Sequence, residues 1–276
     1  MLPALLPSIL PPIHVSLGGL PLAVTALQCA NLMACANEIQ SPTQYSKFAE
    51  KVDPKSTSTV SSRMGMLIIY APAAVVALAS IVLAGPASNE RAALVGSLML
   101  IHFLKRLLEV VFVHRYSGSV GLAVSCFIGT FYACVSALVL TMQSSVPQTI
   151  YEAPGSALAL SCGLIAFVIG QAGNLYHHVI LSEMRKPASD AAADTACRYV
   201  VPSGGLFDMV TMPHYLFEIV AWVGIALCTQ QLNALLAAAG MASYLSGRAV
   251  ATTRWYQDKF GEAWPSSRRH LIPGIF

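Results

Sequence analysis

The sequence predicts an all-α, polytopic membrane protein built as a bundle of about seven transmembrane helices. Of its 276 residues, 55% are hydrophobic and only 11% are charged, against about 25% in an ordinary soluble domain. So few charged residues cannot cover the surface of a soluble protein of this length. The apolar residues also form long blocks, and the mean hydropathy is +0.63. Lipid is therefore the expected solvent.

The helices follow from the apolar blocks, because a transmembrane helix needs about 20 mostly apolar residues. These blocks predict helices at 15–36, 65–84, 92–113, 119–143, 156–182, 210–228 and 232–256. The connections are short except for 37–63 and 183–206, where Pro, Ser, Asp and Gly concentrate. Pro213 fits the first turn of the sixth helix or a kink in it. We find no internal repeat and no second domain.

The basic residues predict the orientation in the membrane. With seven helices and a cytoplasmic C-terminus, Arg91 is the one exception among sixteen Lys and Arg residues that otherwise fall on the cytoplasmic side or in the cytoplasmic halves of helices. This is the bias of the positive-inside rule, and it places the N-terminus in the lumen. No Lys or Arg precedes Lys47, so the charged start of a signal peptide is missing and the N-terminus is expected to be retained.

Two function classes find no support in the composition. The chain has no basic tail and no basic stripe interleaved with aromatic residues, so no nucleic-acid partner is expected. Its seven cysteines are odd in number and scattered through apolar blocks, which is typical of small buried residues. Neither a CxxC nor an HExxH spacing occurs, and no metal site is expected.

A first cluster of ionisable residues lies in the run IHFLKRLLEVVFVHRY. An ionisable side chain at mid-membrane costs about 2.5–3.5 kcal/mol on insertion scales, so such residues need a reason. Lys105 and Glu109 are four residues apart, as are His102 and Arg106, so each pair shares a helix face. An internal ion pair near the cytoplasmic end explains this cluster as well as a binding site does.

A second cluster lies in the run GNLYHHVILSEMRKP. Spacings of four and seven put Asn174, His178 and Arg185 on one helix face, with Ser182 beside them. This alignment favours a binding face over a helix end with solvated groups. For His177, outside the stripe, a solvated position at the membrane interface is expected.

A third cluster comprises His214, Tyr215 and Glu218, in PHYLFEIVAWVG. His214 and Glu218 are four residues apart, and a carboxylate in an apolar helix just after a proline indicates a hydrogen-bonding task. The alternative is a purely structural His–Glu pair.

These runs, in this order, resemble the steroid 5α-reductase and trans-2-enoyl-CoA reductase family. The resemblance is carried best by GNLYHHVIL…MR, RYVVPSGGLFDMVTMPHYLFEIVAW, GRAVATTRWYQDKF and WPSSRRHLIPGIF. HFLKRLLEVVFVHRYSG is similar to the enoyl-CoA reductase branch, and YSKF and SRMGMLIIYAP are looser matches. The overall layout looks closest to a 5α-reductase-like branch.

The resemblance implies an enzyme of known chemistry. Family members are seven-helix membrane proteins that use NADPH to reduce a carbon–carbon double bond conjugated to a carbonyl in a lipid. Residues 1–150 would form the lipid-substrate side of a single membrane domain, and 151–276 would hold the cofactor. The positions that match family cofactor residues are Asn174, Arg185, Tyr199, Glu218, Arg248 and Tyr256. His178 and His214 stand where some relatives carry other polar residues, and we expect them in the same cofactor site.

This chain departs from the family pattern at two places. The 5α-reductases carry a glutamate at or next to the position of Ile69–Tyr70 that helps to hold the steroid ketone, and no acid stands there in this chain. A histidine is frequent just ahead of the final tyrosine, where this chain has Thr252 and Thr253.

The expected reaction assigns roles to the remaining polar residues. Hydride adds to the β-carbon, and the negative charge that builds on the carbonyl oxygen needs a fixed donor. A proton then reaches the α-carbon from an acid or from water. Tyr215 is the first choice for the donor because it is neutral at pH 7, and Tyr70 is the second, although each could be an ordinary core or interfacial aromatic. Lys105 completes the catalytic set. His102, Arg106 and Glu109 are expected to bind substrate.

The cofactor and substrate classes remain open to alternatives. No GxGxxG follows a strand, so NADPH would bind between helices rather than on a Rossmann fold. A 4-ene-3-oxo-steroid-like substrate is favoured over a very-long-chain 2-enoyl-CoA. A membrane S-adenosylmethionine-dependent methyltransferase and a non-catalytic scaffold are the alternatives of other classes. The family implies the endoplasmic reticulum, and the oligomeric state is not predicted.

Overall fold

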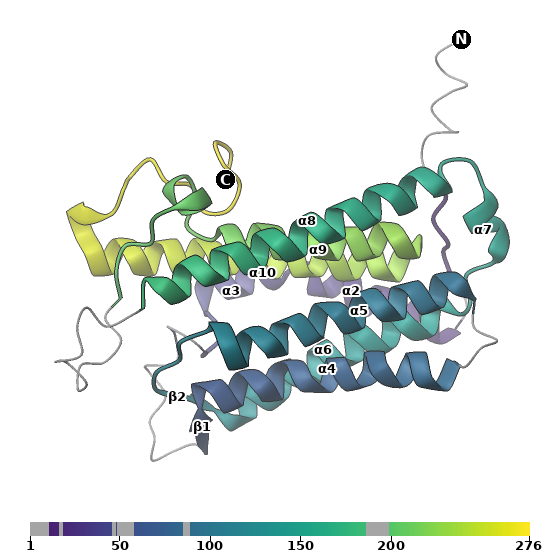
Figure 1. The fold of residues 1–276 in the computed structure, drawn as a ribbon, viewed down its shortest axis with the longest axis horizontal. Helices are drawn as coiled ribbons and strands as arrows, with labels where there is room; N and C mark the ends of the chain where they lie inside the picture. The colour runs from purple at the N-terminus through teal and green to yellow at the C-terminus, as the bar shows by residue number, and fades with distance from the viewer. Residues whose placement is uncertain (1–10, 17–18, 46–47, 49–57, 85–88, 186–198) are drawn as a thin grey trace, which may run out of the picture.

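The computed structural model describes residues 11–16, 19–45, 48, 58–84, 89–185 and 199–276. Its long helices lie side by side along the longest axis of the molecule (Figure 1). They are α2 (Gly19–Asn31), α3 (Ala34–Gln40), α4 (Ser62–Ala84), α5 (Glu90–Leu108), α6 (Leu122–Gln143), α8 (Ser156–Glu183), α9 (Pro213–Thr229) and α10 (Leu232–Phe260). The shorter elements are a π-helical turn η3 (Glu109–Val113), the helix α7 (Gln148–Glu152), and two 3-10 turns, η4 (Gly205–Asp208) and η5 (Gly261–Ala263).

Helices therefore occur in all seven predicted places, but the number of membrane spans is not settled by this. Four helices of the described chain are long and apolar enough to cross a membrane, namely α4, α6, α8 and α10. Helix α9 is apolar but shorter, with 17 residues. The protein is thus a mostly helical membrane protein, and seven spans remain a prediction.

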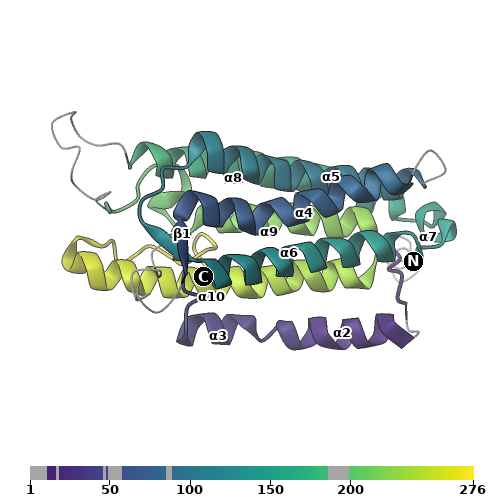
Figure 2. The ribbon, with the colours of Figure 1, turned by 90° about the horizontal axis from the view of Figure 1, so that it is seen from below.

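The first predicted helix, 15–36, is wrong as a single element. The chain instead forms α2 and α3, separated by a turn at Leu32 and Met33. The turn is held by the neighbouring helix, because the Ser243 hydroxyl of α10 donates to the Leu32 carbonyl at 2.6 Å and accepts from the Cys35 amide at 3.1 Å. Both short helices lie along α10 at the edge of the bundle (Figure 2).

A small sheet replaces the start of the predicted helix at 119–143. Strand β1 (Thr59–Ser61) pairs in antiparallel register with β2 (Ser119–Gly121), and α4 and α6 begin directly after them. The β-branched residues Val60 and Val120 face each other in this ribbon, as is usual for strands. An apolar pattern of three residues is too short to distinguish a strand from a helix start.

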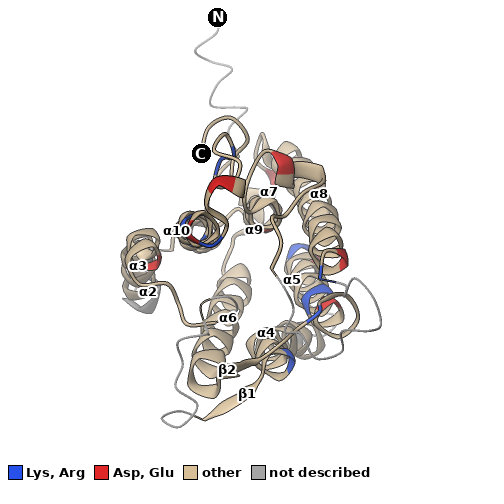
Figure 3. Cartoon of the chain, turned by 90° about the vertical axis from the view of Figure 1, so that its left-hand side faces the viewer, with Lys and Arg blue, Asp and Glu red and all other residues tan. Residues whose placement is uncertain are grey.

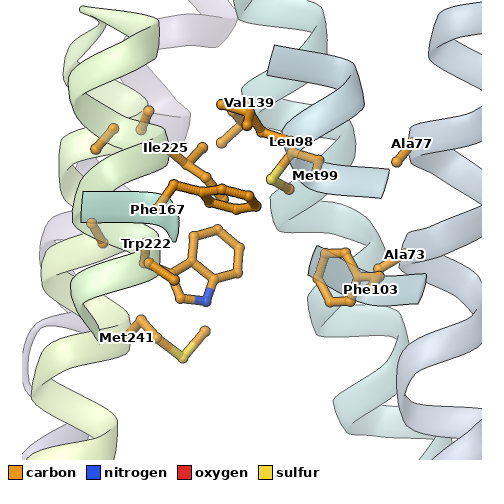
Figure 4. Packing of buried hydrophobic residues seen from close by; sticks show 14 of the residues in the cluster. Ala73, Ala77, Leu98, Met99, Phe103, Val139, Phe167, Trp222, Ile225 and Met241 are labelled. Atoms are coloured by element: carbon orange, nitrogen blue, oxygen red, sulfur yellow. The ribbon is translucent and has the colours of Figure 1, made fainter. Parts of the chain in front are cut away.

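The core lies where α4, α5, α6, α8, α9 and α10 meet. Phe103 and Trp222 pack edge to face with ring centroids 6.3 Å apart, and both are almost fully buried. Figure 4 shows them with Met99, Phe167 and Ile225 between the two halves of the bundle. Helix α8 approaches α9 very closely, because a side chain at Gly170 would meet backbone atoms of α9 at about 2.4 Å. Small residues commonly permit such contacts between membrane helices.

The two ends of the bundle differ in charge. The helix ends that carry Arg63, Lys105, Arg185 and Lys259 lie together with β1 and β2 (Figures 1 and 3). Arg91 lies at the opposite end, over the Tyr151 ring at 4.6 Å. We call the β1–β2 end the basic end, and its place on the cytoplasmic side stays a prediction.

Candidate active site

A cavity of about 530 Å³ opens toward the basic end between the helices of the bundle. Most of the site residues predicted from the sequence line it: Tyr70, Arg106, Asn174, His178, Arg185, Tyr199, His214, Tyr215, Glu218 and Tyr256. They come from five helices and the 199–212 connection, far apart along the chain. The other predicted residues, His102, Lys105, Glu109 and Arg248, stand behind the lining.

The predicted face of α8 forms one wall of the cavity. Asn174, His178 and Ser182 are at least nine-tenths buried, and they line the cavity with Arg185. The Asn174 amide donates to the His214 carbonyl at 2.8 Å. This bond joins α8 to the first turn of α9 and orients both toward the cavity.

The ionisable cluster of α5 forms a buried network behind that wall. The Lys105 ammonium contacts Glu109 at 2.9 Å, as predicted from their spacing, and also bonds the side-chain oxygen of Asn174. Glu109 also pairs with Arg106. Glu109 is 1% exposed, and two cations compensate its charge. A buried carboxylate needs such partners.

Arg106 connects this network to Tyr70 of α4. Its guanidinium donates to the Tyr70 hydroxyl at 2.8 Å and to Nδ1 of His178 at 3.0 Å. Because the Tyr70 oxygen accepts from Arg106, its own O–H is available for an acceptor in the cavity. A charged donor to the oxygen strengthens the hydrogen bond that the same hydroxyl donates.

Glu218 reaches the cavity from α9 and is paired with His102 of α5 at 3.2 Å. His102 also bonds the Gln171 side chain at 2.8 Å, and its ring packs on Trp222 with centroids 5.4 Å apart. The sequence analysis missed His102 as a partner of Glu218, and this is a first correction. Helical spacing alone could not reveal a partner that comes from another helix.

His177 is the second correction, because its predicted solvated position is wrong. The side chain is buried, its Nδ1 donates to the Gly173 carbonyl at 2.7 Å, and its Nε2 accepts from the Leu206 amide at 3.2 Å. The ring also stacks on Phe217, with centroids 5.2 Å apart. His177 therefore holds the η4 turn against α8, at the entrance of the cavity.

Basic and aromatic residues surround the cavity entrance. Arg115 and Arg185 both line it, and the Arg185 guanidinium donates to the Arg115 carbonyl at 3.1 Å. Tyr199 lies 5.9 Å from Arg185 and 5.1 Å from Lys259, measured from its ring centre. Tyr256 stacks on Trp264 at 5.0 Å. Planar aromatic rings beside guanidinium groups are suitable for a nucleotide, whose phosphates Arg binds through two parallel hydrogen bonds.

Several lining residues were missed in the sequence, among them Tyr45, His114, Tyr116 and Tyr132. His114 follows the π-helical turn, and its ring packs on His178 at 4.6 Å. Burial, with the nearby Arg106 charge, lowers the pKa of His114 to about 3. Burial likewise raises the pKa of Tyr116. The sequence signal for His114 was its place at the end of the run IHFLKRLLEVVFVHRY. A regular α-helix through this run would have directed the His114 side chain away from His178.

Glu109, His114 and His178 also bring three metal-binding atoms within 4.8 Å of one another. The Arg106 guanidinium already contacts two of these three side chains. A divalent ion at this cluster would have to displace that cation.

Arg248 does not line the cavity, although the sequence indicated a cofactor contact. It is 1% exposed and pairs with Glu38 of α3. It also donates to the carbonyls of Thr43 and Tyr45 at 3.0 and 2.9 Å, and it hydrogen-bonds the side chain of Tyr215, which lines the cavity. The Arg248 guanidinium therefore binds groups of the protein itself.

Comparison with known proteins gives the family. The model of the 3-oxo-5-alpha-steroid 4-dehydrogenase family matches residues 121–276, more than half of the chain. Human 3-oxo-5-alpha-steroid 4-dehydrogenase 2 is 29% identical over 253 residues, which cover 89% of this chain and 92% of the human protein. This match includes the α4 and α5 regions that carry Tyr70 and Arg106.

Two further relatives carry different names. The very-long-chain enoyl-CoA reductase of Dictyostelium discoideum is 32% identical over 174 residues, 63% of this chain and 54% of that protein, so the match spans about half of its length. Polyprenal reductase 1 of Arabidopsis thaliana is 27% identical over 216 residues, 67% of this chain and 65% of that protein. All three relatives are named as oxidoreductases. The chain belongs to the 3-oxo-5-alpha-steroid 4-dehydrogenase family.

Proposed function

We propose that this protein uses NADPH to reduce a carbon–carbon double bond conjugated to a carbonyl in a lipid, most readily a 4-ene-3-oxo-steroid-like compound. The observation that carries the proposal is the cavity itself. It combines a basic, aromatic entrance with a deeper part that Tyr70, Tyr215 and Glu218 line together with apolar side chains such as Met66 and Leu245. A reductase of lipids needs both a nucleotide site and an apolar chamber.

The entrance fits the cofactor. Arg115 and Arg185 offer guanidinium groups to its phosphates, and Tyr199 and Tyr256 offer rings to its planar parts. Asn174 and Glu218 lie deeper and would hold the carboxamide end through hydrogen bonds, with Glu218 kept in place by His102. NADPH supplies the hydride when bound. The cytoplasmic side, where we place the basic end, is where NADPH is abundant.

The deeper part fits the reacting carbonyl. Tyr70 is our first choice for the donor, because Arg106 bonds its oxygen at 2.8 Å and Arg106 itself lines the cavity, whereas the arginine partner of Tyr215, Arg248, does not. This reverses the order expected from the sequence, which put Tyr215 first. A fixed, charge-supported donor stabilises the oxyanion without reorganising in the reaction. The 5α-reductase glutamate that helps to hold the substrate carbonyl is absent near Tyr70 in this chain. Arg106 would help to hold the carbonyl in its place.

Lys105 keeps a supporting role in this proposal. Its ammonium is engaged by Glu109 and Asn174 and lies behind the cavity wall. It fixes Asn174 and neutralises Glu109, and so positions the cofactor wall without touching substrate. His102 and Glu109 act in the same indirect way, and substrate contact passes to Arg106.

A very-long-chain 2-enoyl-CoA is the second candidate substrate, because the Dictyostelium relative is 32% identical over 174 residues, against 29% over 253 residues for the human enzyme. The human steroid enzyme is matched over nearly its whole length, however, which favours the steroid-like class. Methyl transfer with S-adenosylmethionine loses its support, since the family and its named relatives are oxidoreductases.

The test is NADPH consumption by the purified protein with a panel of lipids, with products identified by mass spectrometry. The panel contains a 4-ene-3-oxo-steroid, a long-chain 2-enoyl-CoA and a polyprenal. We expect saturation of the double bond in the steroid at the highest kcat/KM. Turnover of the enoyl-CoA alone would move the assignment to the second candidate, and turnover of none in a folded, NADPH-binding protein would contradict the proposal.

A further inference from the structure

Arg248 and Glu38 are 210 residues apart in the sequence and form a buried ion pair that joins α10 to α3. Both side chains are almost fully buried, with 1% and 3% exposure. The backbones are in close contact here, because a side chain at Gly247 would lie about 2.5 Å from the Cys35 carbonyl. A hydrophobic pair would stabilise such a contact at least as well, since two charges must lose their hydration. The ion pair therefore calls for a reason other than stability.

The contacts of the pair show what it fixes. Glu38 accepts from the Thr43 amide at 3.1 Å and from the Thr43 hydroxyl at 2.7 Å. Arg248 donates to the carbonyls of Thr43 and Tyr45 at 3.0 and 2.9 Å. The short segment 41–45 after α3 has no regular structure of its own. The two charged side chains therefore supply the hydrogen bonds that hold it in one conformation.

That segment ends in a wall of the cavity. The Tyr45 ring lies over the Arg248 guanidinium, 3.8 Å from its central carbon. Its hydroxyl is 3.3 Å from the Tyr244 hydroxyl of α10. Tyr45 lines the cavity together with Met66, Tyr132 and Leu245, none of which is charged. This apolar side is where a lipid would lie.

We propose that the Glu38–Arg248 ion pair is a positioning device that fixes Tyr45 as a wall of the lipid part of the cavity and so limits the width of the substrate. Arg248 thereby acts through Tyr45, not through a cofactor phosphate. The proposal rests on the proposed reductase function for its kinetic consequence, but its structural consequence can be measured without any substrate.

The test uses the full-length protein with three variants. Arg248→Met removes the charge at nearly constant volume, and Glu38→Gln with Arg248→Met removes both charges, so that no buried charge remains unpaired. Tyr45→Leu leaves the ion pair intact and changes only the wall. Arg63→Met, an exposed arginine outside the cavity lining, is the matched control. NADPH affinity, KM and kcat are measured with a steroid and with a bulkier lipid enone.

We expect KM for the preferred substrate to rise about tenfold in all three variants, with the dissociation constant of NADPH within about twofold of the parent value. The ratio of kcat/KM for the bulkier lipid to that for the steroid should increase, because the wall has moved or shrunk. A tenfold loss of NADPH affinity in both Arg248 variants, with unchanged selectivity, would overturn the proposal and return Arg248 to the cofactor site.

Amide hydrogen exchange of residues 41–45 provides the readout that needs no turnover. Exchange should accelerate in both Arg248 variants and remain unchanged in Tyr45→Leu and Arg63→Met. Unchanged exchange in the Arg248 variants would overturn the positioning role even in an active enzyme. If the parent protein reduces no lipid but exchange accelerates as expected, the proposed function fails while the positioning role stands.

Discussion

At the scale of single residues, the site depends on bonds between helices that no local pattern reveals. Tyr70 and Arg106 are 36 residues apart and meet at 2.8 Å. Glu218 and His102 are much further apart in the sequence, and their side chains meet at 3.2 Å. The sequence shows which polar residues lie at membrane depth, and each of them is expected to have a partner because an unpaired polar group is costly there. It could not predict the partners, since those depend on how α4, α5 and α9 pack.

Tyr70 carries the first prediction. Tyr70→Phe removes one hydroxyl and should lower kcat by about 10²–10³-fold, the usual loss for one oxyanion donor. NADPH affinity should stay within about twofold, because the ring remains. Steady-state kinetics and a direct NADPH titration measure the two quantities.

Two further variants complete this experiment. Tyr151→Phe, at the end of the bundle opposite the cavity entrance, should leave kcat unchanged. If Tyr215→Phe loses turnover while Tyr70→Phe keeps it, Tyr215 is the donor and our order is wrong.

Glu218 carries the second prediction. Glu218→Gln keeps the shape of the side chain but removes the charge that pairs with His102, so NADPH should bind about tenfold more weakly, near the 1.4 kcal/mol value of one modest polar interaction. The bundle should remain folded, which gel filtration in detergent checks. Equal affinity in the variant and the parent would remove Glu218 from the cofactor site.

His114 gives a prediction for pH. Its folded pKa of about 3 lies below the unfolded value of 6.5, so the unfolded chain takes up a proton first as the pH falls. The stability that neutral His114 contributes is thus complete above pH 6.5 and is progressively lost below it, down to the folded pKa. Between about pH 7.5 and pH 5, the loss amounts to at most about 2 kcal/mol.

Thermal unfolding of the parent and of His114→Gln over this range tests the assignment. The parent should lose more stability than the variant on acidification. Parallel curves would show that the folded His114 titrates normally, and that its burial against His178 is not as described.

At the scale of the elements, apolar blocks predicted where helices lie, but not where they break. The α4, α6 and α8 regions agree with the sequence to within a few residues. The turn between α2 and α3 is held by Ser243 of α10, and the π-helical turn after α5 presents His114 to His178. Both are tertiary effects, because neither segment contains a proline or glycine that would have marked the irregularity.

The contact between α8 and α9 carries the fourth prediction. Gly170→Leu would force a side chain into α9 backbone at about 2.4 Å, and overpacking of this kind costs about 1–3 kcal/mol. The melting temperature in detergent should fall clearly. Ala172→Leu, on the exposed side of the same helix, should change it little. Equal behaviour of the two variants would show that α8 and α9 are not packed this closely.

At the scale of the whole molecule, the bundle separates two tasks along its axis. The basic end gathers the charged and aromatic residues of the entrance, and the opposite end holds Arg91 with a buried network that includes Gln143, Gln231 and Ser156. A cavity open at one end would admit the nucleotide that we propose from one side of the membrane. The membrane class and this asymmetry were predictable from composition and charge, whereas the enclosed cavity required the structure.

The central claim is hydride transfer from NADPH to a conjugated double bond. The most direct measurement is the reaction of the purified protein with a 4-ene-3-oxo-steroid and NADPH deuterated at nicotinamide C4, followed by mass spectrometry of the product. We predict a saturated ketone that carries deuterium at the β-carbon, with a proton from water at the α-carbon. A product without deuterium from the cofactor, or no saturated product from any conjugated lipid of the panel, would contradict the account.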